Sequence, residues 1–231
     1  MAWDLGNKEE RKTLMKQLGS EYREKCLRHK SPKDCHYLAH FLETVNQDVA
    51  KAATLFRKTC DDHKYGDSCQ KFASLVRRGI EGIDPNVSVD YDRKGCDYGQ
   101  AKSCFHAAMA IVSDAERGQV SSKKIELNDP LEAVNLLDRG CHLGCDNSCY
   151  LAGGLYLVGV PGILERNVSV TSRYDLKACQ LGNQLACANL RGALPVESPA
   201  HDNPISNGFV IRRLQLKIRN EQRRREYSNS F

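Results

Sequence analysis

The feature of this sequence that most limits its possible folds is the regular placement of its cysteines. Ten of the eleven cysteines form five pairs, with eight residues between the members of the first two pairs and seven in the others. The pairs are Cys26/Cys35, Cys60/Cys69, Cys96/Cys104, Cys141/Cys149 and Cys179/Cys187. The first members follow one another at intervals of 34, 36, 45 and 38 positions. A period of this length is typical of repeat proteins.

Each cysteine pair lies between two segments with a helical pattern. Amphipathic segments such as VAKAATLFRKTC lead up to the first cysteine, and segments such as SCYLAGGLYLV begin near the second. Gly99, Gly144 and Gly182 stand where a helix often ends in a left-handed residue. The sequence therefore predicts an all-α fold, an α/α solenoid of about five helix–turn–helix repeats in a single domain over residues 1–231. The expected repeats cover about 7–45, 47–79, 87–114, 129–159 and 168–194.

The two cysteines of a pair lie at the end of one helix and the start of the next, close enough to meet across the turn. We therefore predict one disulfide in each repeat, worth about 2.5 kcal/mol in chain entropy. Two alternatives stay open, namely structural zinc and buried free thiols that act as small apolar residues. Zinc usually takes closely spaced Cys-x-x-Cys pairs, and covalent haem needs Cys-x-x-Cys-His; the sequence contains neither motif. Neither a metal nor a cofactor is predicted.

Cys145 is the eleventh cysteine, and it has no partner in this scheme. It falls in the turn between Cys141 and Cys149, a place that favours exposure. It is interpreted either as a tolerated free thiol or as a thiol that exchanges with a neighbouring disulfide. No catalytic constellation accompanies it, since the two S-x-x-K matches lack the S-D-N and K-T-G motifs. We therefore predict a non-enzymatic protein, with a thiol–disulfide exchange enzyme as the alternative.

The end of the chain predicts a capping helix over 206–226 with a basic surface. Its cationic residues are Arg212, Arg213, Lys217, Arg219, Arg223, Arg224 and Arg225. A polar outer face is expected of a terminal repeat. The alternative is a patch for acidic partners, anionic lipid or RNA. The net charge of +5 and the lack of interleaved aromatic residues argue against nucleic-acid binding.

The N-terminus shows neither a secretory signal nor a mitochondrial presequence, because it lacks an apolar core and carries Asp4, Glu9 and Glu10. The most apolar stretch, from Tyr150 to Leu164, is interrupted by glycines and proline and is too short to span a bilayer. A soluble protein without a transmembrane segment is therefore expected. The two Asn-x-Ser motifs, at 86–88 and 167–169, are interpreted as helix caps.

The repeat resembles the Sel-one-like repeat, on the motif C-x-x-G-x-x-x-[AS]-C in CDYGQAKSC (96–104), CHLGCDNSC (141–149) and CQLGNQLAC (179–187). Paired cysteines in such repeats occur in secreted bacterial cysteine-rich repeat proteins, some of them β-lactamases or penicillin binders. They also occur in the mitochondrial cytochrome c oxidase assembly factor seven family. This chain is similar to the second group in its order of cysteine spacings and in a polar insertion at 114–129, ahead of the fourth repeat.

The resemblance implies a soluble factor of the mitochondrial intermembrane space, required for assembly of respiratory-chain complex IV. Such a factor would act as a disulfide-stabilised scaffold that binds respiratory-chain assembly proteins or subunits. It would be retained in the intermembrane space by the oxidative import relay, whose substrates would be the paired cysteines. A β-lactamase-like activity is the further alternative, suggested by the bacterial group.

Overall fold

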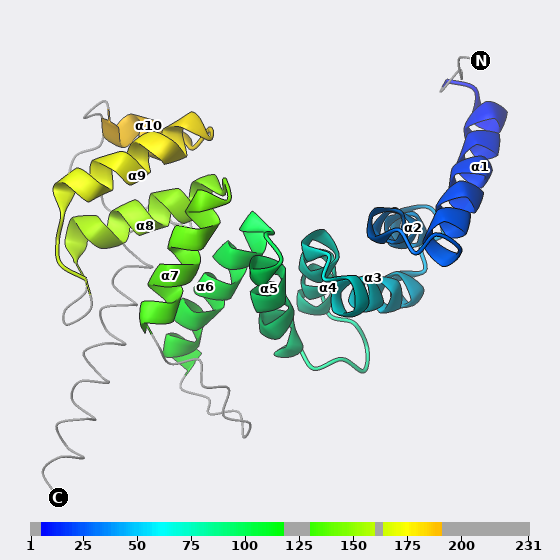
Figure 1. Cartoon of the computed structure of the whole chain (residues 1–231), viewed down its shortest axis with the longest axis horizontal. Helices are drawn as coiled ribbons and strands as arrows, with labels where there is room; N and C mark the ends of the chain where they lie inside the picture. The colour runs from blue at the N-terminus through cyan, green and yellow to red at the C-terminus, as the bar shows by residue number, and fades with distance from the viewer. Residues whose placement is uncertain (1–5, 118–129, 160–163, 191–231) are drawn as a thin grey trace, which may run out of the picture. The chain divides into compact units, whose positions relative to one another are not determined.

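The computed structural model describes residues 6–117, 130–159 and 164–190, and every element in these ranges is an α-helix (Figure 1). The predicted all-α class is thereby confirmed. The helices are α1 (Lys8–Leu27), α2 (Pro32–Thr44), α3 (Val49–His63), α4 (Gly66–Arg77), α5 (Val87–Asp97), α6 (Ala101–Arg117), α7 (Pro130–His142), α8 (Asp146–Val158), α9 (Val168–Gln180) and α10 (Gln184–Leu190). They divide between two compact units, Met1–Gln100 and Ala101–Phe231. The boundaries of the five repeats stay a prediction.

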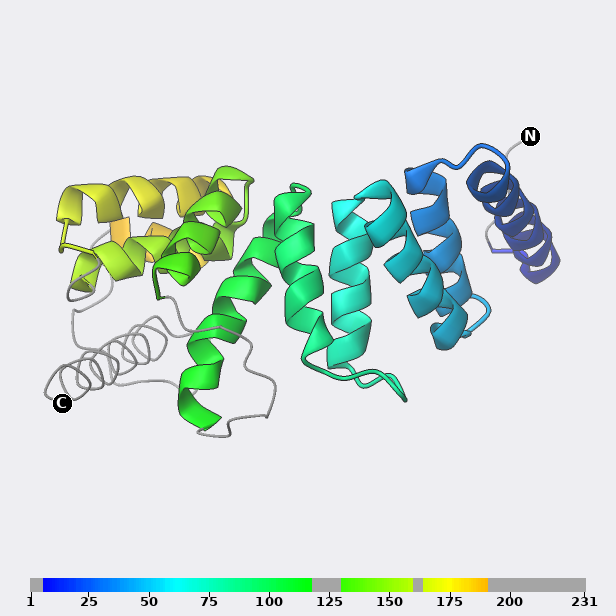
Figure 2. The same ribbon diagram turned by 60° about the horizontal axis from the view of Figure 1, so that its bottom comes forward.

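The first unit holds α1 to α5, and each of these helices packs against the next one along the chain. Figure 2 shows the same succession from a second direction. The core of the first unit is built from Phe56, Phe72, Leu75 and Val76, each with at most 2% of its surface exposed. Buried alanines of α2, α3 and α4 let the helices approach around these larger side chains. The unit is therefore stabilised by a series of contacts between neighbours, as expected of a helical-repeat array.

The second unit holds α6 to α10, which also pack in chain order, with a further contact between α6 and α8. Ile111, Leu137, Leu151 and Leu155 are its largest fully buried side chains. α6 runs to Arg117, three residues past the expected end of its repeat. The expected 206–226 helix and most of the polar insertion lie outside the described residues. None of the described helices is both long and apolar enough to cross a membrane.

The two Asn-x-Ser motifs have different outcomes as helix caps. Asn167 precedes α9, and its side-chain oxygen accepts a hydrogen bond from the Val170 N–H at 3.1 Å, which confirms this cap. Asn86 holds the cap position of α5, but its side chain makes no capping bond. Asp84 accepts a bond from the backbone N–H of Asn86 at 2.9 Å instead, so the neighbouring aspartate orders this turn.

The turns between paired helices contain left-handed residues, as predicted for Gly99, Gly144 and Gly182, whose φ angles are 84°, 95° and 102°. In the first two hairpins the left-handed residues are lysines, Lys30 and Lys64, with φ of 51° and 53°. The glycine of the second hairpin, Gly66, has a different purpose. A Cβ on Gly66 would lie 2.9 Å from the backbone oxygen of Tyr98, so the glycine allows the start of α4 to approach the end of α5.

The left-handed lysine at the end of α3 gives a test of this turn geometry. We expect Lys64→Gly to raise the free energy of unfolding by about 0.5–1 kcal/mol, because glycine adopts positive φ without the steric cost of a Cβ. Urea denaturation of the oxidised chain measures the change. Lys58→Gly, in the exposed interior of the same helix, is the matched control and should lower stability by about 1 kcal/mol. A loss of stability in both variants would contradict the turn geometry.

Candidate functional site

The paired cysteines form the most distinctive chemical feature of the described chain. Disulfides join Cys26 to Cys35, Cys60 to Cys69, Cys141 to Cys149, and Cys179 to Cys187, with Cα–Cα distances of 4.6, 4.8, 4.5 and 4.7 Å. Cys96 and Cys104 are disulfide-bonded as well. None of these ten sulfurs is a free thiol, so the alternatives of thiolate zinc ligands and buried thiols do not apply to them. Each of these four pairs ties the end of one helix to the start of the next.

Small residues directly before the cysteines allow paired helices to approach closely. Thr59 and Ser68 precede the two cysteines of the second hairpin, and Gly140 and Ser148 precede those of the fourth. All three hydroxyl residues are at most 1% exposed. A Cβ on Gly140 would lie 2.4 Å from the Ser148 hydroxyl oxygen, so a larger residue would push α7 and α8 apart. The disulfides therefore lie where the helix backbones come close together.

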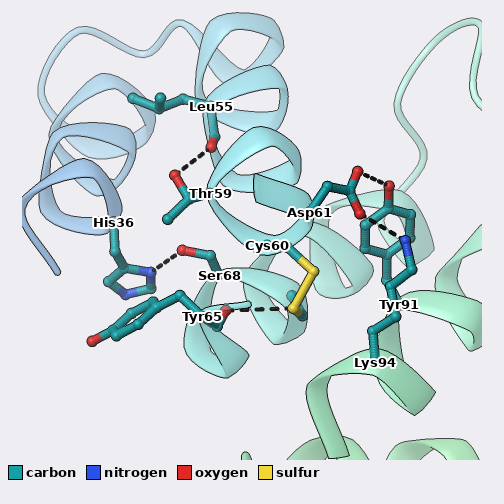
Figure 3. Close-up of a disulfide and its surroundings, with 10 residues drawn as sticks. His36, Leu55, Thr59, Cys60, Asp61, Tyr65, Ser68, Tyr91 and Lys94 are labelled. Atoms are coloured by element: carbon teal, nitrogen blue, oxygen red, sulfur yellow. Dashed lines mark hydrogen bonds and ion pairs between the residues drawn. A yellow bond between two sulfur atoms is a disulfide. The ribbon is translucent and has the colours of Figure 1, made fainter. Parts of the chain in front are cut away.

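The second disulfide lies between two polar contacts, which Figure 3 shows on either side of it. On one side, a hydrogen bond of 3.0 Å joins the Nδ1 atom of His36 to the hydroxyl of Ser68. On the other side, Asp61 accepts bonds from the Tyr91 hydroxyl at 2.7 Å and from the Lys94 ammonium at 2.6 Å. These contacts link α2 to α4 and α3 to α5, so they connect each hairpin to its neighbour.

His36 is held uncharged at neutral pH by its surroundings. Its side chain is buried against Phe56, Tyr65 and His40, with ring centroids 5.3, 5.5 and 5.3 Å away. This burial, with smaller contributions from His40 and Lys71, lowers the pKa of His36 to about 4. His36 and His40 are four residues apart on α2, a spacing that is visible in the sequence and predicts their contact. No cluster of three His, Cys, Asp or Glu side chains that could hold a metal is found in the described ranges.

Cys145 is a free thiol, but the turn does not expose it. Only 6% of its surface is accessible, so the expected exposure of this residue is wrong. Cys145 is the N-cap residue of α8, its N–H donates to the Gly140 oxygen at 2.9 Å, and its carbonyl accepts from Cys149 at 3.1 Å. These bonds anchor its backbone between α7 and α8. The described structure therefore leaves little room for a thiol reagent to reach the sulfur.

A repeated Tyr-Asp dipeptide was not identified in the sequence, although aligning the repeats on their cysteines brings it out. The dipeptide occurs as Tyr91-Asp92 and as Tyr174-Asp175, ahead of the first cysteine of the third and of the fifth pair. In both places the tyrosine lies five residues before that cysteine and the aspartate four residues before it. Each tyrosine hydroxyl donates to an aspartate on an earlier helix, Tyr91 to Asp61 and Tyr174 to Asp138. Each aspartate of the dipeptide is buried, at 1% and 5% exposure. The dipeptide thus links a hairpin to the one before it.

The predicted basic patch, from Arg212 to Arg225, lies outside the described residues. Another basic surface, which the cysteine pattern does not indicate, is formed by α1, where Lys12, Lys16 and Arg23 line a groove against α2. Their spacing of four and seven residues places them on one face of the helix. That periodicity is the sequence signal by which this face could have been found.

The serines before the second cysteines supply a matched pair of variants. Ser68→Ala should lower the free energy of unfolding by about 1–2 kcal/mol, because it leaves the buried Nδ1 of His36 without its hydrogen bond. Ser148→Ala should raise it by about 0.5–1 kcal/mol, because the buried hydroxyl of Ser148 has no hydrogen-bond partner among the described residues. Urea denaturation of the oxidised chain distinguishes them. Equal shifts in one direction would show that the hydrogen bond of Ser68 has no effect on stability.

No protein-family model matches the chain. Solved structures share its fold: a Sel1 (Sel-one) repeat protein from Oxalobacter formigenes has a TM-score of 0.56 at 17% identity, covering 80% of this chain and 74% of that one. A protective antigen of uropathogenic Escherichia coli with an SLR fold has a TM-score of 0.58 at 15% identity, covering 90% of this chain and 45% of that one. The chain is therefore a Sel-one-like helical-repeat protein whose hairpins carry disulfides.

Curated relatives define the family more closely. Cytochrome c oxidase assembly factor 7 of Xenopus tropicalis is 30% identical over 191 residues, covering 80% of this chain and 79% of the relative. The Drosophila melanogaster homolog of that factor is 28% identical over 224 residues, covering 82% of both chains. This chain belongs to the cytochrome c oxidase assembly factor 7 family.

Proposed function

We propose that this chain acts in the assembly of cytochrome c oxidase as a non-enzymatic, disulfide-stabilised scaffold for partner proteins. The observation that carries the proposal is similarity to assembly factor 7 over four-fifths of the chain, combined with the stapled repeats. A helical-repeat array offers long faces for binding proteins and holds them on a rigid backbone. The expected partners are respiratory-chain assembly proteins or subunits of the oxidase.

We propose the mitochondrial intermembrane space as the location. Disulfides persist in oxidising compartments and are rare in the cytosol, and here ten cysteines are bonded. An oxidative import relay that forms these bonds would trap the folded chain, because the stapled hairpins could no longer thread back through a narrow pore. The bonded pairs support this proposal through the redox chemistry of the compartment that they need.

The thiol–disulfide exchange alternative depends on an accessible attacking sulfur, and the burial of Cys145 argues against it. Cys145→Ser separates the two functions. The scaffold proposal expects the variant to assemble cytochrome c oxidase at the wild-type level. An exchange enzyme that uses Cys145 would lose its insulin-reducing activity in this variant.

Gene deletion in cells that make this protein tests the proposal. We expect a selective fall in assembled cytochrome c oxidase on native gels, with citrate synthase as an unaffected control. Re-expression of the wild-type chain should restore the complex. Protease protection in intact mitochondria and in mitoplasts tests the compartment, and alkylation under non-reducing conditions tests the bonds. Normal levels of the oxidase in the deleted cells would overturn the proposed function.

A further inference from the structure

A groove of about 530 Å³ lies between α1 and α2, within the first unit, and its floor is apolar. The groove is lined by Leu38, Phe41 and Leu42 of α2. Two further lining residues are well exposed, Met15 at 36% and Val45 at 45%. The packing of α1 is thin, since Cys26 is its only buried residue. The groove therefore leaves apolar side chains uncovered at the N-terminal end of the helices that the structure describes.

The two helices touch at a defined point inside this groove. A Cβ on Gly19 would lie 2.8 Å from the Phe41 ring, so α1 rests directly on that ring. Lining residues come from both sides of the contact, Lys12 and Lys16 before it and Arg23 after it. The groove thus follows the axis of α1 instead of forming a round pocket, which favours an elongated occupant.

The rim of the groove carries positive charge that nothing in the described chain neutralises. Lys12, Lys16 and Arg23 line it, and no acidic side chain does. No carboxylate of the described residues forms an ion pair with any of the three. Lys25 of α1 and Arg28, the C-cap residue of this helix, are by contrast paired with Glu21 and Glu24. Charge complementarity therefore calls for an anionic partner along one edge of the groove.

We propose that this groove binds an acidic amphipathic segment of a partner protein, with a bulky apolar side chain over Phe41 and carboxylates against Lys12 and Lys16. The inference deepens the scaffold function proposed above and rests on it. A helical segment that lays its apolar face in a groove is a common mode of peptide recognition. A flat lipid surface fits less well, because Leu38 is buried and Phe41 and Leu42 are partly buried, whereas the three cations are exposed.

Fluorescence anisotropy with the full oxidised chain tests the proposal. The probe is a labelled sixteen-residue helical peptide with leucines along one face and glutamates beside them, and the control peptide carries lysines in place of glutamates. We expect saturable binding of the acidic peptide only, weakened by added salt. Anionic vesicles of phosphatidylcholine and phosphatidylserine serve as the second probe. Binding to vesicles without binding to the peptide would overturn the proposal.

Charge-reversal variants test whether the acidic peptide binds in the groove. Lys12→Glu with Lys16→Glu should weaken binding of the acidic peptide by at least about tenfold. The matched control, Lys58→Glu with Lys64→Glu, makes the same change of net charge on α3 and its exposed C-terminal end, and should weaken binding less than about twofold. Equal loss in both variants would overturn the proposed site, and matching thermal unfolding excludes misfolding as the cause.

A floor variant and a cell assay complete the test. Val45→Gln replaces a side chain that is already exposed and should weaken binding several-fold without unfolding the chain; unchanged affinity would overturn the apolar part of the proposal. The groove variants are also used to restore cells that lack the gene. Loss of peptide binding in vitro with normal oxidase assembly would overturn the role of the groove in assembly. Normal oxidase in the deleted cells would overturn the scaffold function itself, whatever the peptide result.

Discussion

Replacing Cys60 and Cys69 together by alanine should lower the free energy of unfolding of the oxidised chain by about 3 kcal/mol. Their disulfide closes a loop of eight intervening residues, which contributes about 2.5 kcal/mol through the entropy of the unfolded chain. Both cysteines are fully buried among Phe56 and Phe72. Removing their sulfurs therefore also loses packing, which adds to the cost. Urea denaturation followed by far-ultraviolet circular dichroism measures the change.

The last disulfide, Cys179–Cys187, supplies the matched control. Its loop has seven intervening residues, so its entropic contribution is almost the same, but both of its cysteines are only partly buried. Its removal should therefore cost less than the removal of the second disulfide. Each described helix packs mainly on its sequence neighbours, so the loss of stability should be concentrated in the helices next to the removed disulfide. Hydrogen exchange of the backbone amides measures where protection is lost. An oxidised chain and a fully reduced chain with the same urea midpoint would contradict the stabilising role of the bonds.

The cysteine period predicts the hairpins well because it reports local geometry. A bond between residues eight or nine positions apart requires the chain to reverse, and the glycines at 99, 144 and 182 make that reversal possible. Lys30 and Lys64 show the limit of this reasoning. Both adopt the conformation that usually favours glycine, so the turn is imposed by the helices and the disulfide on either side of it.

Features that depend on packing between repeats are harder to predict from the pattern. The exposure of Cys145 depends on how α7 and α8 enclose the turn, and residue spacing says nothing of that enclosure. The hydrogen bonds from Tyr91 to Asp61 and from Tyr174 to Asp138 join residues 30 and 36 positions apart. Their donors become visible once the repeats are aligned, but their acceptors occupy different positions in the two repeats. Only the packed helices identify them.

Asp92 should make the stability of the first unit fall as the pH rises from about 4 to about 7. Burial raises the pKa of Asp92 to about 7, although the nearby Arg77 guanidinium acts to lower it. Asp92 is 1% exposed, and its Oδ1 accepts no hydrogen bond from any residue that the structure describes. In the unfolded chain an aspartate releases its proton near pH 4, so between the two pKa values the folded state holds a proton that the unfolded state has lost. The stabilisation is thus complete below pH 4 and lost above pH 7.

His36 contributes a slope of the opposite sign, which makes the variant more informative than the wild type. Burial lowers the pKa of His36 to about 4, so the unfolded state binds the extra proton and stability from this group falls as the pH drops below about 6.5. In the wild-type chain the two slopes partly cancel between pH 4 and pH 6.5. Asp92→Asn should remove one of them and leave a chain that loses stability steadily on acidification.

The measurement is the difference in free energy of unfolding between the wild-type chain and Asp92→Asn, taken by urea denaturation from pH 4 to pH 8. This difference should change by about 4 kcal/mol across the range, at about 1.4 kcal/mol per pKa unit, with the variant gaining relative stability as the pH rises. Arg77 keeps a polar partner in the variant and remains 35% exposed, so its charge stays hydrated.

Asp61→Asn is the control of opposite sign. Burial acts to raise the pKa of Asp61, but hydrogen bonds from Lys94 and Tyr91 hold this pKa below its usual range. The Asp61→Asn variant should therefore be less stable than the wild-type chain at neutral pH but not in acid. Parallel curves for wild type and Asp92→Asn would mean that the buried carboxylate is ionised throughout, with the Arg77 ion pair outweighing the cost of burial.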